Sequence, residues 1–561
     1  MFKPGKKTRT LFKVVGIFIL IIFLFSFWFR ITTSIPVPVT DTGLFSKYKA
    51  VRTDSFCSCG KGWLQQNKYG LSEMYVEGKP YERGIITGKL TADLIERQEE
   101  AFVAELHELV PSKFYIHFLN QVVRWFNRNI YKHIPQEYLE EIYGVSQSAS
   151  EKFSYIGPNY YRLLNYHAAH DIGHAMQQYH FTACTSFSVW GNKTTDSSLI
   201  VGRNFDFSAG DEFCKDKIIC FVKPEHGIPF AMITWGGMTG VTSGMNLNGL
   251  TVTINAGKSK IPLSARTPVT LVAREILQYA SNIKEAYEIA GKNKLFISES
   301  FLIGSAEDNK SAVIEKSPVK TALRTADGNF IISTNHFLDT LFHDDKLNTE
   351  NALKSASMPR YERTCELINR YNKLDINIVA SILRDRFSLK DKQAGMGNEK
   401  AINQLIAHHS VIFSPKRRII WVSTSPWQLG EYIAYDLKKI FNDYSLIKKK
   451  TVIYEPGLTI PKDTFVNTSD FKNFMRYKVL SKEINKAIKN KEEVSEKKLD
   501  MFLSLNPEYY AAYITVNSYY QSRKNYSRAL FYCRLALTKE LSSLEEKENI
   551  EKEIKKCKSK L

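Results

Sequence analysis

The chain has 561 residues, 43% hydrophobic and 24% charged, so it has room for two or three domains and the composition of an ordinary folded protein. Its formal net charge of +19 would suit a nucleic-acid-binding protein. However, Lys and Arg are interleaved with Asp and Glu, and the sequence contains no nucleic-acid-binding motif. We therefore exclude nucleic acid as a partner and relate the basic charge to an anionic lipid surface.

The N-terminal segment, residues 1–30, has the pattern of a membrane anchor. Residues 1–13 carry five basic side chains and no acid, and residues 14–29 are almost wholly apolar before Arg30. A cleaved signal peptide is the alternative, but the only small residues near its end are Thr32, Thr33 and Ser34, a weak cleavage site. We favour an uncleaved helix, with the basic end in the cytoplasm and the rest of the chain outside it, in the periplasm if the source is bacterial.

Residues 31–74 read as a linker and an entry segment, and residues 75–183 as a mostly helical segment that begins with a strand and a turn. His167, His170 and His174 recur at spacings of three and four, so they share one face of a predicted helix. Such a face is able to bind a transition metal, or else it packs beside the segment that enters Cys184. No carboxylate or thiol pattern accompanies the histidines, so we assign no metal and no cofactor.

Cys184 stands between small residues, directly before a strand-like run. If the chain is cut just before it, its new α-amino group, with a reference pKa near 8, lies next to the thiol. One residue then supplies both the nucleophile and its base. The competing interpretation is a buried free cysteine on a core strand.

From Cys184 to residue 460, apolar runs with period two predict strands, and three helical patterns lie among them. The expected strands are residues 185–190, 199–205, 218–223, 230–235, 240–246, 250–256, 300–305, 312–316 and 330–334, with a last hairpin over 410–423. The expected helices are residues 267–279, 283–290 and 360–371. This order indicates a layered α+β architecture. Cys214 and Cys220 are spaced to close a small disulfide loop.

Residues 461–561 are helical and charged, and they contain one tetratricopeptide-like pattern. One repeat is too few for a solenoid, so the tail is either a partner-binding unit or a helical hairpin docked on the preceding domain.

The motifs in residues 75–435 together resemble those of the acyl-coenzyme A:6-aminopenicillanic acid acyltransferase family, a group of N-terminal nucleophile hydrolases. The resemblance rests on residues 78–84, 184–187, 202–207, 244–250 with Asn255, 334–337, 360–363 and 409–413. It implies a four-layer αββα sandwich and autoproteolysis at the Ala183–Cys184 bond. Ala183 departs from the glycine usual in the family, and its methyl group restricts the backbone before the scissile bond.

The resemblance also implies roles for the site residues, which are listed here as catalytic candidates: Cys184, Arg203, Asp206, Asn255, Asn335 and Arg360. The asparagines would stabilise the oxyanion, Asp206 would hold the α-amino group, and Arg203 would favour the thiolate. Arg363 is the alternative to Arg360. The expected partners are a small acylated molecule and the membrane, with a protein partner for the tail.

Two other hypotheses stay open. In one, His336 or His409 activates Cys184 without chain cleavage. In the other, the chain is an inactive tethered adaptor that acts through its helical tail.

Overall fold

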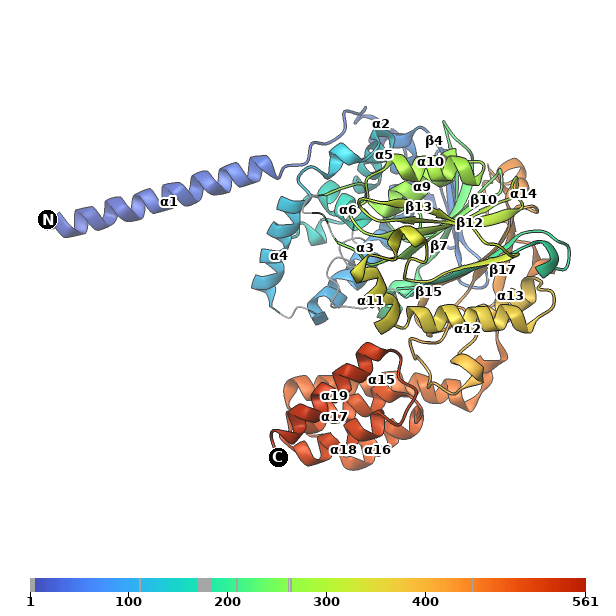
Figure 1. Cartoon of the computed structure of the whole chain (residues 1–561). Coiled ribbons are helices and arrows are strands. Elements are labelled where there is room, and N and C mark those ends of the chain that lie inside the picture. Colours follow the sequence, from blue (N-terminus) through green and yellow to red (C-terminus); the bar gives the residue numbers. More distant parts are fainter. Residues whose placement is uncertain are drawn as a thin grey trace.

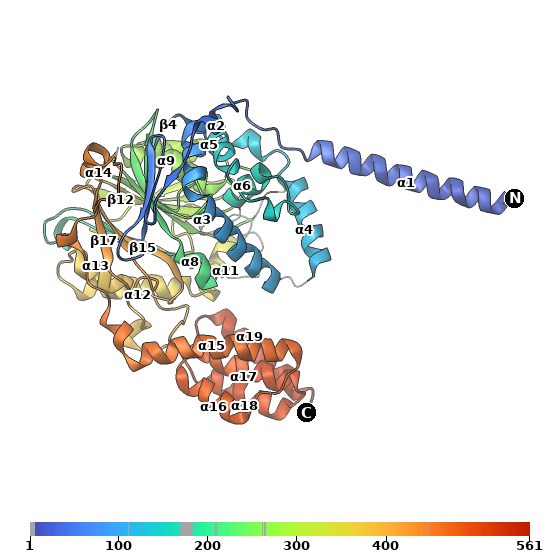
Figure 2. The ribbon, with the colours of Figure 1, turned by 180° about the vertical axis from the view of Figure 1, so that it is seen from behind.

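The computed structural model describes residues 6–109, 112–168, 183–207, 210–260, 262, 265–445 and 447–561. Two β-sheets stack in the centre of the molecule, with helices on their outer faces (Figure 1). A long helix, α1 (Lys6–Thr32), projects from one side, and a bundle of helices lies below the sheets (Figure 2).

The large sheet has eleven strands, of which β4 and β7 are parallel and all other neighbours antiparallel. In spatial order they are β1 (Val51–Arg52), β2 (Phe56–Cys59), β3 (Gly62–Gln66), β4 (Ser72–Gly78), β7 (Ile218–Pro224), β8 (Phe230–Thr234), β9 (Ser243–Asn246), β10 (Leu250–Ala256), β11 (Glu299–Ser305), β12 (Lys310–Lys316) and β13 (Thr321–Arg324). Residues 51–66, in the expected entry segment, thus supply the three strands at one end of the sheet.

The small sheet is antiparallel and has six strands. In spatial order they are β14 (Phe330–Ser333), β5 (Thr185–Val189), β6 (Ile200–Asp206), β15 (Ala407–Ser414), β16 (Ile419–Ser423) and β17 (Tyr432–Asp436). Every residue of β5, β6 and β15 is buried, because both faces of this sheet are covered.

Three hydrophobic layers hold the sandwich together. Side chains from the two sheets meet between them, including Val201, Phe221 and Val411. The other face of the large sheet packs against α3 (Pro80–Leu109), α9 (Val269–Tyr279) and α10 (Ile283–Lys292), and that of the small sheet against α12 (Ser357–Arg370) and α13 (Ile376–Leu383). The described residues therefore form helix, sheet, sheet and helix layers.

Shorter helices complete the domain. They are α2 (Leu44–Lys47), α4 (Lys113–Phe126), α5 (Gln136–Ser146), α6 (Asn159–His167), α8 (Gly210–Lys215), α11 (Lys346–Lys354) and α14 (Leu437–Asp443).

The N-terminal helix is long and apolar enough to cross a membrane. Its segment Phe12–Thr32 has a mean hydropathy of 2.5, and none of this segment is buried against the rest of the chain. A signal sequence passes the same test, so the helix by itself does not separate an anchor from a leader.

The C-terminal tail forms α15 (Ser469–Asn490), α16 (Glu496–Leu505), α17 (Tyr510–Ser522), α18 (Tyr526–Ala536) and α19 (Leu544–Lys558). It is docked on the preceding domain, since Leu405 and Trp427 belong to the same apolar cluster as Phe474 and Val516. Among the described residues the tail therefore has the docked arrangement, one of the two interpretations of its sequence.

The expected disulfide between Cys214 and Cys220 is wrong. All eight cysteines lie in the described part of the chain, and all are free. Cys214 lies on α8 with its Sγ atom 3.6 Å from the carbonyl oxygen of Gly210, whereas Cys220 lies on β7 in the core beneath the α3 and α9 helices. The two thiols are close in sequence but belong to different elements, so they do not meet.

Candidate active site around Cys184

Cys184 lies immediately before β5, and its side chain is fully buried. The register pairs Thr185 with Asn204, which brings Cys184 beside Phe205 of β6. One step further, the backbone N–H of Ala183 donates to the carbonyl oxygen of Asp206 at 3.1 Å. The Ala183–Cys184 peptide is therefore held as an extension of the β5–β6 pair.

Arg203 contacts the thiol directly. Its Nη2 atom lies 3.5 Å from Sγ of Cys184 and 2.6 Å from the carbonyl oxygen of Ile254, and its Nη1 atom donates to the carbonyl oxygen of Thr242 at 3.0 Å. Burial raises the pKa of the Cys184 thiol to about 11, while the charges of Arg203 and Arg360 oppose this increase. The guanidinium is thus fixed by two backbone carbonyls of the facing sheet, with one edge toward the sulfur.

Arg360, on α12, holds the other side of the cysteine. Its Nη1 atom donates to the carbonyl oxygen of Cys184 and, at 3.0 Å, to the hydroxyl of Thr185. Its Nη2 atom donates to Oδ1 of Asn335 at 2.8 Å. One arginine therefore links the backbone of Cys184 to a predicted oxyanion residue.

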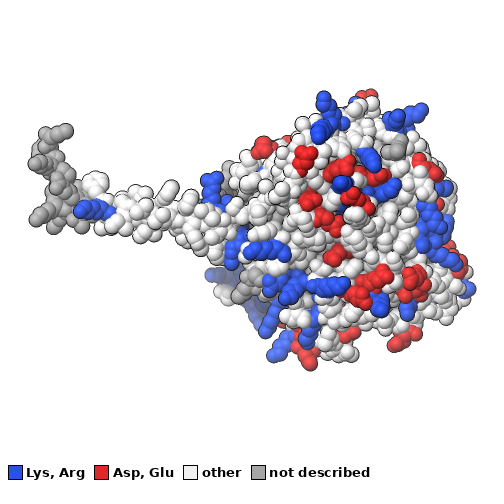
Figure 3. Space-filling view, turned by 90° about the horizontal axis from the view of Figure 1, so that it is seen from above, with Lys and Arg blue, Asp and Glu red and all other residues white. Residues whose placement is uncertain are grey.

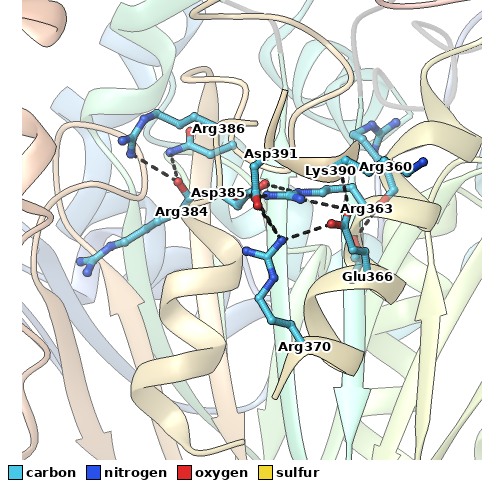
Figure 4. Close-up of polar contacts among 11 residues, drawn as sticks. Arg360, Arg363, Glu366, Arg370, Arg384, Asp385, Arg386, Lys390 and Asp391 are labelled. Atoms are coloured by element: carbon cyan, nitrogen blue, oxygen red, sulfur yellow. Dashed lines mark hydrogen bonds and ion pairs between the residues drawn. The ribbon is translucent and has the colours of Figure 1, made fainter. Parts of the chain in front are cut away.

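Arg363, one helical turn later, faces a different set of partners. It donates to Asp385, Asp391 and Glu366 at 2.7–3.0 Å, in a charged network that ties α12 to the segment after α13 (Figure 4). Its guanidinium is saturated by carboxylates there. The geometry therefore favours Arg360 as the arginine of the site.

The two asparagines flank the start of β5. Nδ2 of Asn335 donates to the carbonyl oxygen of Ala256 at 3.0 Å. Asn255 accepts from the hydroxyl of Ser186 at 2.9 Å, and its Nδ2 atom donates to the carbonyl oxygen of Ser333 at 2.7 Å. A side-chain amide has two N–H donors, so these bonds orient each amide while using one donor.

Asp206 and Gln404 lie at the peptide bond itself. Nε2 of Gln404 donates to the carbonyl oxygen of Ala183 at 3.1 Å and to Oδ2 of Asp206 at 3.3 Å. Oδ1 of Asp206 is buried and has no hydrogen-bond partner in the described part of the chain. Burial raises the pKa of this carboxyl to about 7, and the nearby arginines, Arg360 and Arg203, lower it again.

Gln404 is a site residue that sequence reasoning missed. It lies in the irregular segment between α13 and β15, where no motif or periodicity marks it. The tail holds this segment: Nδ2 of Asn398 donates to the carbonyl oxygen of Glu540 at 2.9 Å, and Lys400 pairs with the Glu540 carboxylate at 2.8 Å. The docked tail therefore helps to position Gln404.

His409 is near the site but engaged elsewhere. Its Nε2 atom lies 2.8 Å from the hydroxyl of Ser243 and 3.3 Å from Nη1 of Arg203, and its Nδ1 atom lies 2.9 Å from Nδ1 of His408. Burial first, and then the positive charges around it, lower its pKa well below the usual range. Both ring nitrogens are thus committed to groups other than the Cys184 thiol.

The Nδ1 atom of His336 is also engaged by groups other than the thiol. Its Nδ1 atom lies 2.7 Å from the Ser357 hydroxyl and 3.2 Å from the Thr334 hydroxyl. Burial lowers its pKa to about 4. Its contact with Ser357 ties the segment around Asn335 to α12.

The predicted histidine face is only partly within the described residues, since His170 and His174 lie outside them. His167 is buried, with Nδ1 2.7 Å from the carbonyl oxygen of Leu163 and Nε2 accepting from the backbone N–H of Thr239 at 2.9 Å. Its lone pair is occupied by that N–H, so His167 acts as a core histidine and not as a ligand.

A small apolar pocket of about 50 Å³, partly open to solvent, lies beside the site. Phe205, the neighbour of Cys184, forms part of its wall, and the Arg203 guanidinium lies 4.4 Å from the centre of the Phe205 ring. The remaining wall is supplied by Ile95, Gln98, Glu99, Phe102, Leu163, Tyr166, Phe207, Phe213, Trp235, Gly236, Gly237 and Met238. A group bound at Cys184 would therefore have an aromatic, water-poor cavity next to it.

Residues 192–425 match the family described as acyl-coenzyme A:6-aminopenicillanic acid acyl-transferase. The resemblance noted in the sequence is thereby confirmed, although the match begins after Cys184. A curated but uncharacterised protein of Archaeoglobus fulgidus is 24% identical over 292 residues, which are 48% of this chain and 47% of that protein. The chain thus spans about half the length of this relative.

Two solved structures are also similar. A Caenorhabditis elegans N-acylethanolamine-hydrolyzing acid amidase ortholog is 17% identical, with a TM-score of 0.31, covering 42% of this chain and 93% of that one. A mutant of conjugated bile acid hydrolase from Clostridium perfringens is 13% identical, with a TM-score of 0.33, covering 48% of this chain and 97% of that one.

Proposed function

We propose that the chain is a membrane-anchored N-terminal-cysteine acyltransferase or amidohydrolase that activates itself by cleavage between Ala183 and Cys184. One observation carries this proposal. Two buried guanidinium groups from different elements, Arg203 and Arg360, converge on the sulfur and the carbonyl oxygen of Cys184, next to the bond to be cut.

Self-cleavage follows from the groups around the peptide. The sulfur of Cys184 attacks the carbonyl carbon of Ala183, and its proton passes to a base, a role that we assign to Asp206. The negative oxygen that develops on Ala183 is stabilised by the N–H of Gln404. The C–N bond breaks as the nitrogen takes a proton, which leaves a thioester and frees the α-amino group of Cys184. Water then hydrolyses the thioester to the Ala183 carboxylate and the free thiol.

The same residues support turnover. The α-amino group of Cys184 accepts the thiol proton, and the sulfur attacks the acyl carbonyl of the substrate. In this proposal Asn255 and Asn335 donate to the oxyanion, and the leaving amine or alcohol departs with the proton. Water or another acceptor then attacks the thioester and regenerates the thiol.

The pocket indicates the class of acyl group. Its wall is mostly aromatic and aliphatic, and it adjoins Phe205 beside the nucleophile. We therefore infer an acyl donor whose acyl part is apolar. Such donors partition into membranes, which agrees with an anchor formed by α1 that keeps the catalytic domain on the non-cytoplasmic side.

Intact-mass measurement and N-terminal sequencing of the purified chain test the proposal. A fragment that begins at Cys184, absent from the Cys184→Ala variant, is the expected result. An uncut parent chain whose thiol still turns over acyl substrates would replace self-cleavage by activation through a histidine. An uncut chain whose thiol does not react with an alkylating reagent would leave only a tethered adaptor.

A further inference from the structure

Helix α4 (Lys113–Phe126) presents an apolar stripe to the outside. Tyr115, Phe118, Val122 and Trp125 are spaced by three and four residues, and between 37% and 53% of each side chain is exposed. The outward stripe of a surface helix is normally polar, because only its inner face is covered. Here four consecutive positions of the outward stripe are aromatic or aliphatic.

The inner face of α4 is held firmly by the domain. Phe126 packs against Phe296 with ring centroids 5.0 Å apart, and Nδ2 of Asn120 donates to the carbonyl oxygen of Ile156 at 2.7 Å. The stripe is therefore the solvent-facing side of a helix whose opposite side packs on the domain.

The position of the stripe relative to α1 identifies what covers it. The Trp125 ring lies 5.5 Å from that of Trp28 and 6.1 Å from that of Phe29, near the C-terminal end of α1. Helix α4 runs across the direction of α1, on the side of the body from which α1 projects (Figures 1 and 2). If α1 crosses a bilayer, α4 lies along the surface of the leaflet where α1 emerges.

Basic side chains accompany the stripe. The Arg128 guanidinium lies 4.0 Å from the centre of the Trp125 ring, and the Arg124 guanidinium flanks the inner side of the helix over Tyr161. Lys and Arg side chains gather on the part of the body next to α1 (Figure 3). Tryptophan with a neighbouring arginine is the pair that membrane-interface segments use at headgroup level.

We propose that α4 is an in-plane membrane-binding helix, whose stripe Tyr115–Phe118–Val122–Trp125 inserts into the anionic leaflet that α1 leaves. This proposal rests on the proposed membrane anchoring, and it adds a second contact that fixes the orientation of the catalytic domain. Such a contact would hold the α3–α6 side of the domain, which lines the apolar pocket, close to the lipid surface.

The full chain reconstituted into vesicles of equal parts phosphatidylcholine and phosphatidylglycerol provides the test. A polarity-sensitive fluorophore is attached to Phe118→Cys and, as a control, to Thr195→Cys in the exposed β5–β6 turn at the far end of the body from α1 (Figures 1 and 2). Seven native cysteines are buried and Cys365 is partly exposed, so the unaltered chain measures background labelling. A third label at Leu20→Cys reports on α1 independently.

We expect the Phe118 probe to be quenched severalfold by spin-labelled lipid and protected from aqueous iodide, and the Thr195 probe to behave oppositely. A Phe118 probe as open to iodide as the Thr195 probe, with the Leu20 probe in lipid, would overturn the proposal while leaving the anchor intact. Protection of Phe118 that rises with the protein-to-lipid ratio and without lipid quenching would assign the stripe to a second copy of the chain. If α1 is removed as a leader, the same Phe118 measurement on the mature chain decides the proposal alone.

Discussion

The Nη2 atom of Arg203 lies 3.5 Å from the Sγ atom of Cys184, and both groups are completely buried. In such a place a thiolate is strongly disfavoured by lost hydration, and the nearby positive charge is what makes it accessible. The same guanidinium is fixed by two backbone carbonyls. The charge is therefore a permanent part of the site and does not depend on substrate.

Replacing Arg203 should make the thiol harder to ionise. In Arg203→Met we expect the pKa of Cys184 to rise by about 1 unit or more, since an opposite charge at this distance shifts a pKa by about 1–3 units. Alkylation by iodoacetamide at fixed pH should then slow by about tenfold or more. Arg203→Lys retains the charge and should retain part of the rate. Equal alkylation rates for Met and parent would show that the charge does not act on the sulfur.

Arg360 and Arg363 should separate chemistry from stability. Arg360→Met loses the bonds to the Cys184 carbonyl and to Asn335, so we expect kcat for acyl transfer to fall by about 10²-fold with a small change in unfolding. Arg363→Met leaves Asp385, whose side chain is largely buried, without its ion-pair partner and should lower the free energy of unfolding by about 2 kcal/mol. Kinetics and denaturant unfolding of both variants check this. The reverse pattern would exchange their roles.

The sequence predicted the features that follow from a local residue pattern and missed those that depend on tertiary contacts. Strands such as β6 and β10 were predictable because both their faces are buried and their sequences are mostly apolar. Strands β2 and β3 were missed because they are short, and β3 ends in the polar pair Gln65 and Gln66. Strand β3 is placed in the sheet by pairing with β4, and β2 by pairing with β3, which no local pattern records.

The candidate site likewise contains residues that motifs predicted and residues that only tertiary contacts reveal. Of the candidates that motifs indicated, Arg203 contacts the Cys184 thiol, and Asn335 is linked to the Cys184 carbonyl oxygen through Arg360. Gln404 reaches Ala183 across 221 positions of sequence, and its segment is held by the tail, so only the tertiary contacts reveal it. His167 is a residue type that binds metals, but both of its ring nitrogens are occupied by hydrogen-bond partners in the core.

Removing the Gln404 amide should slow self-cleavage. Its N–H donates to the Ala183 carbonyl oxygen, where negative charge develops, and loss of one such donor costs about 10²–10³-fold in rate. Gln404→Leu and Gln404→Glu, neither of which has that donor, should both accumulate the uncut precursor. Gln428 is a buried glutamine without a side-chain hydrogen-bond partner among the described residues, so Gln428→Leu is the matched control. Gel analysis of precursor against time measures the rates, and unchanged cleavage in both Gln404 variants would contradict the role.

Self-cleavage should also depend on pH through Asp206. Burial raises the pKa of this carboxyl to about 7, so its basic form is absent in acid and appears as the pH passes through about 7. We expect the cleavage rate to rise over that range in the parent and to lose this step in Asp206→Asn, as followed by mass spectrometry after a pH jump. A variant that kept the same inflection would remove Asp206 as the base.

Lys217 should reduce stability at neutral pH and cease to do so in alkali. It is buried, its Nζ atom donates to the carbonyl oxygen of Ser423 at 3.2 Å, and burial lowers its pKa from 10.5 to about 8. Below pH 8 the folded chain carries a buried charge that the unfolded chain holds in water. Between about pH 8 and 10.5 the folded form loses its proton first, so the unfolded state binds more protons and stability rises with pH.

Lys217→Met should therefore unfold at higher denaturant than the parent at about pH 7, by up to about 3 kcal/mol, and the difference should shrink toward about pH 10.5. Lys217→Arg keeps the charge throughout and should show no such convergence with Met. Denaturant midpoints of the three chains across this pH range provide the measurement. A gap between Met and parent that stays constant with pH would mean that the lysine enters the core by packing its methylene chain, and that its charge is not what costs stability.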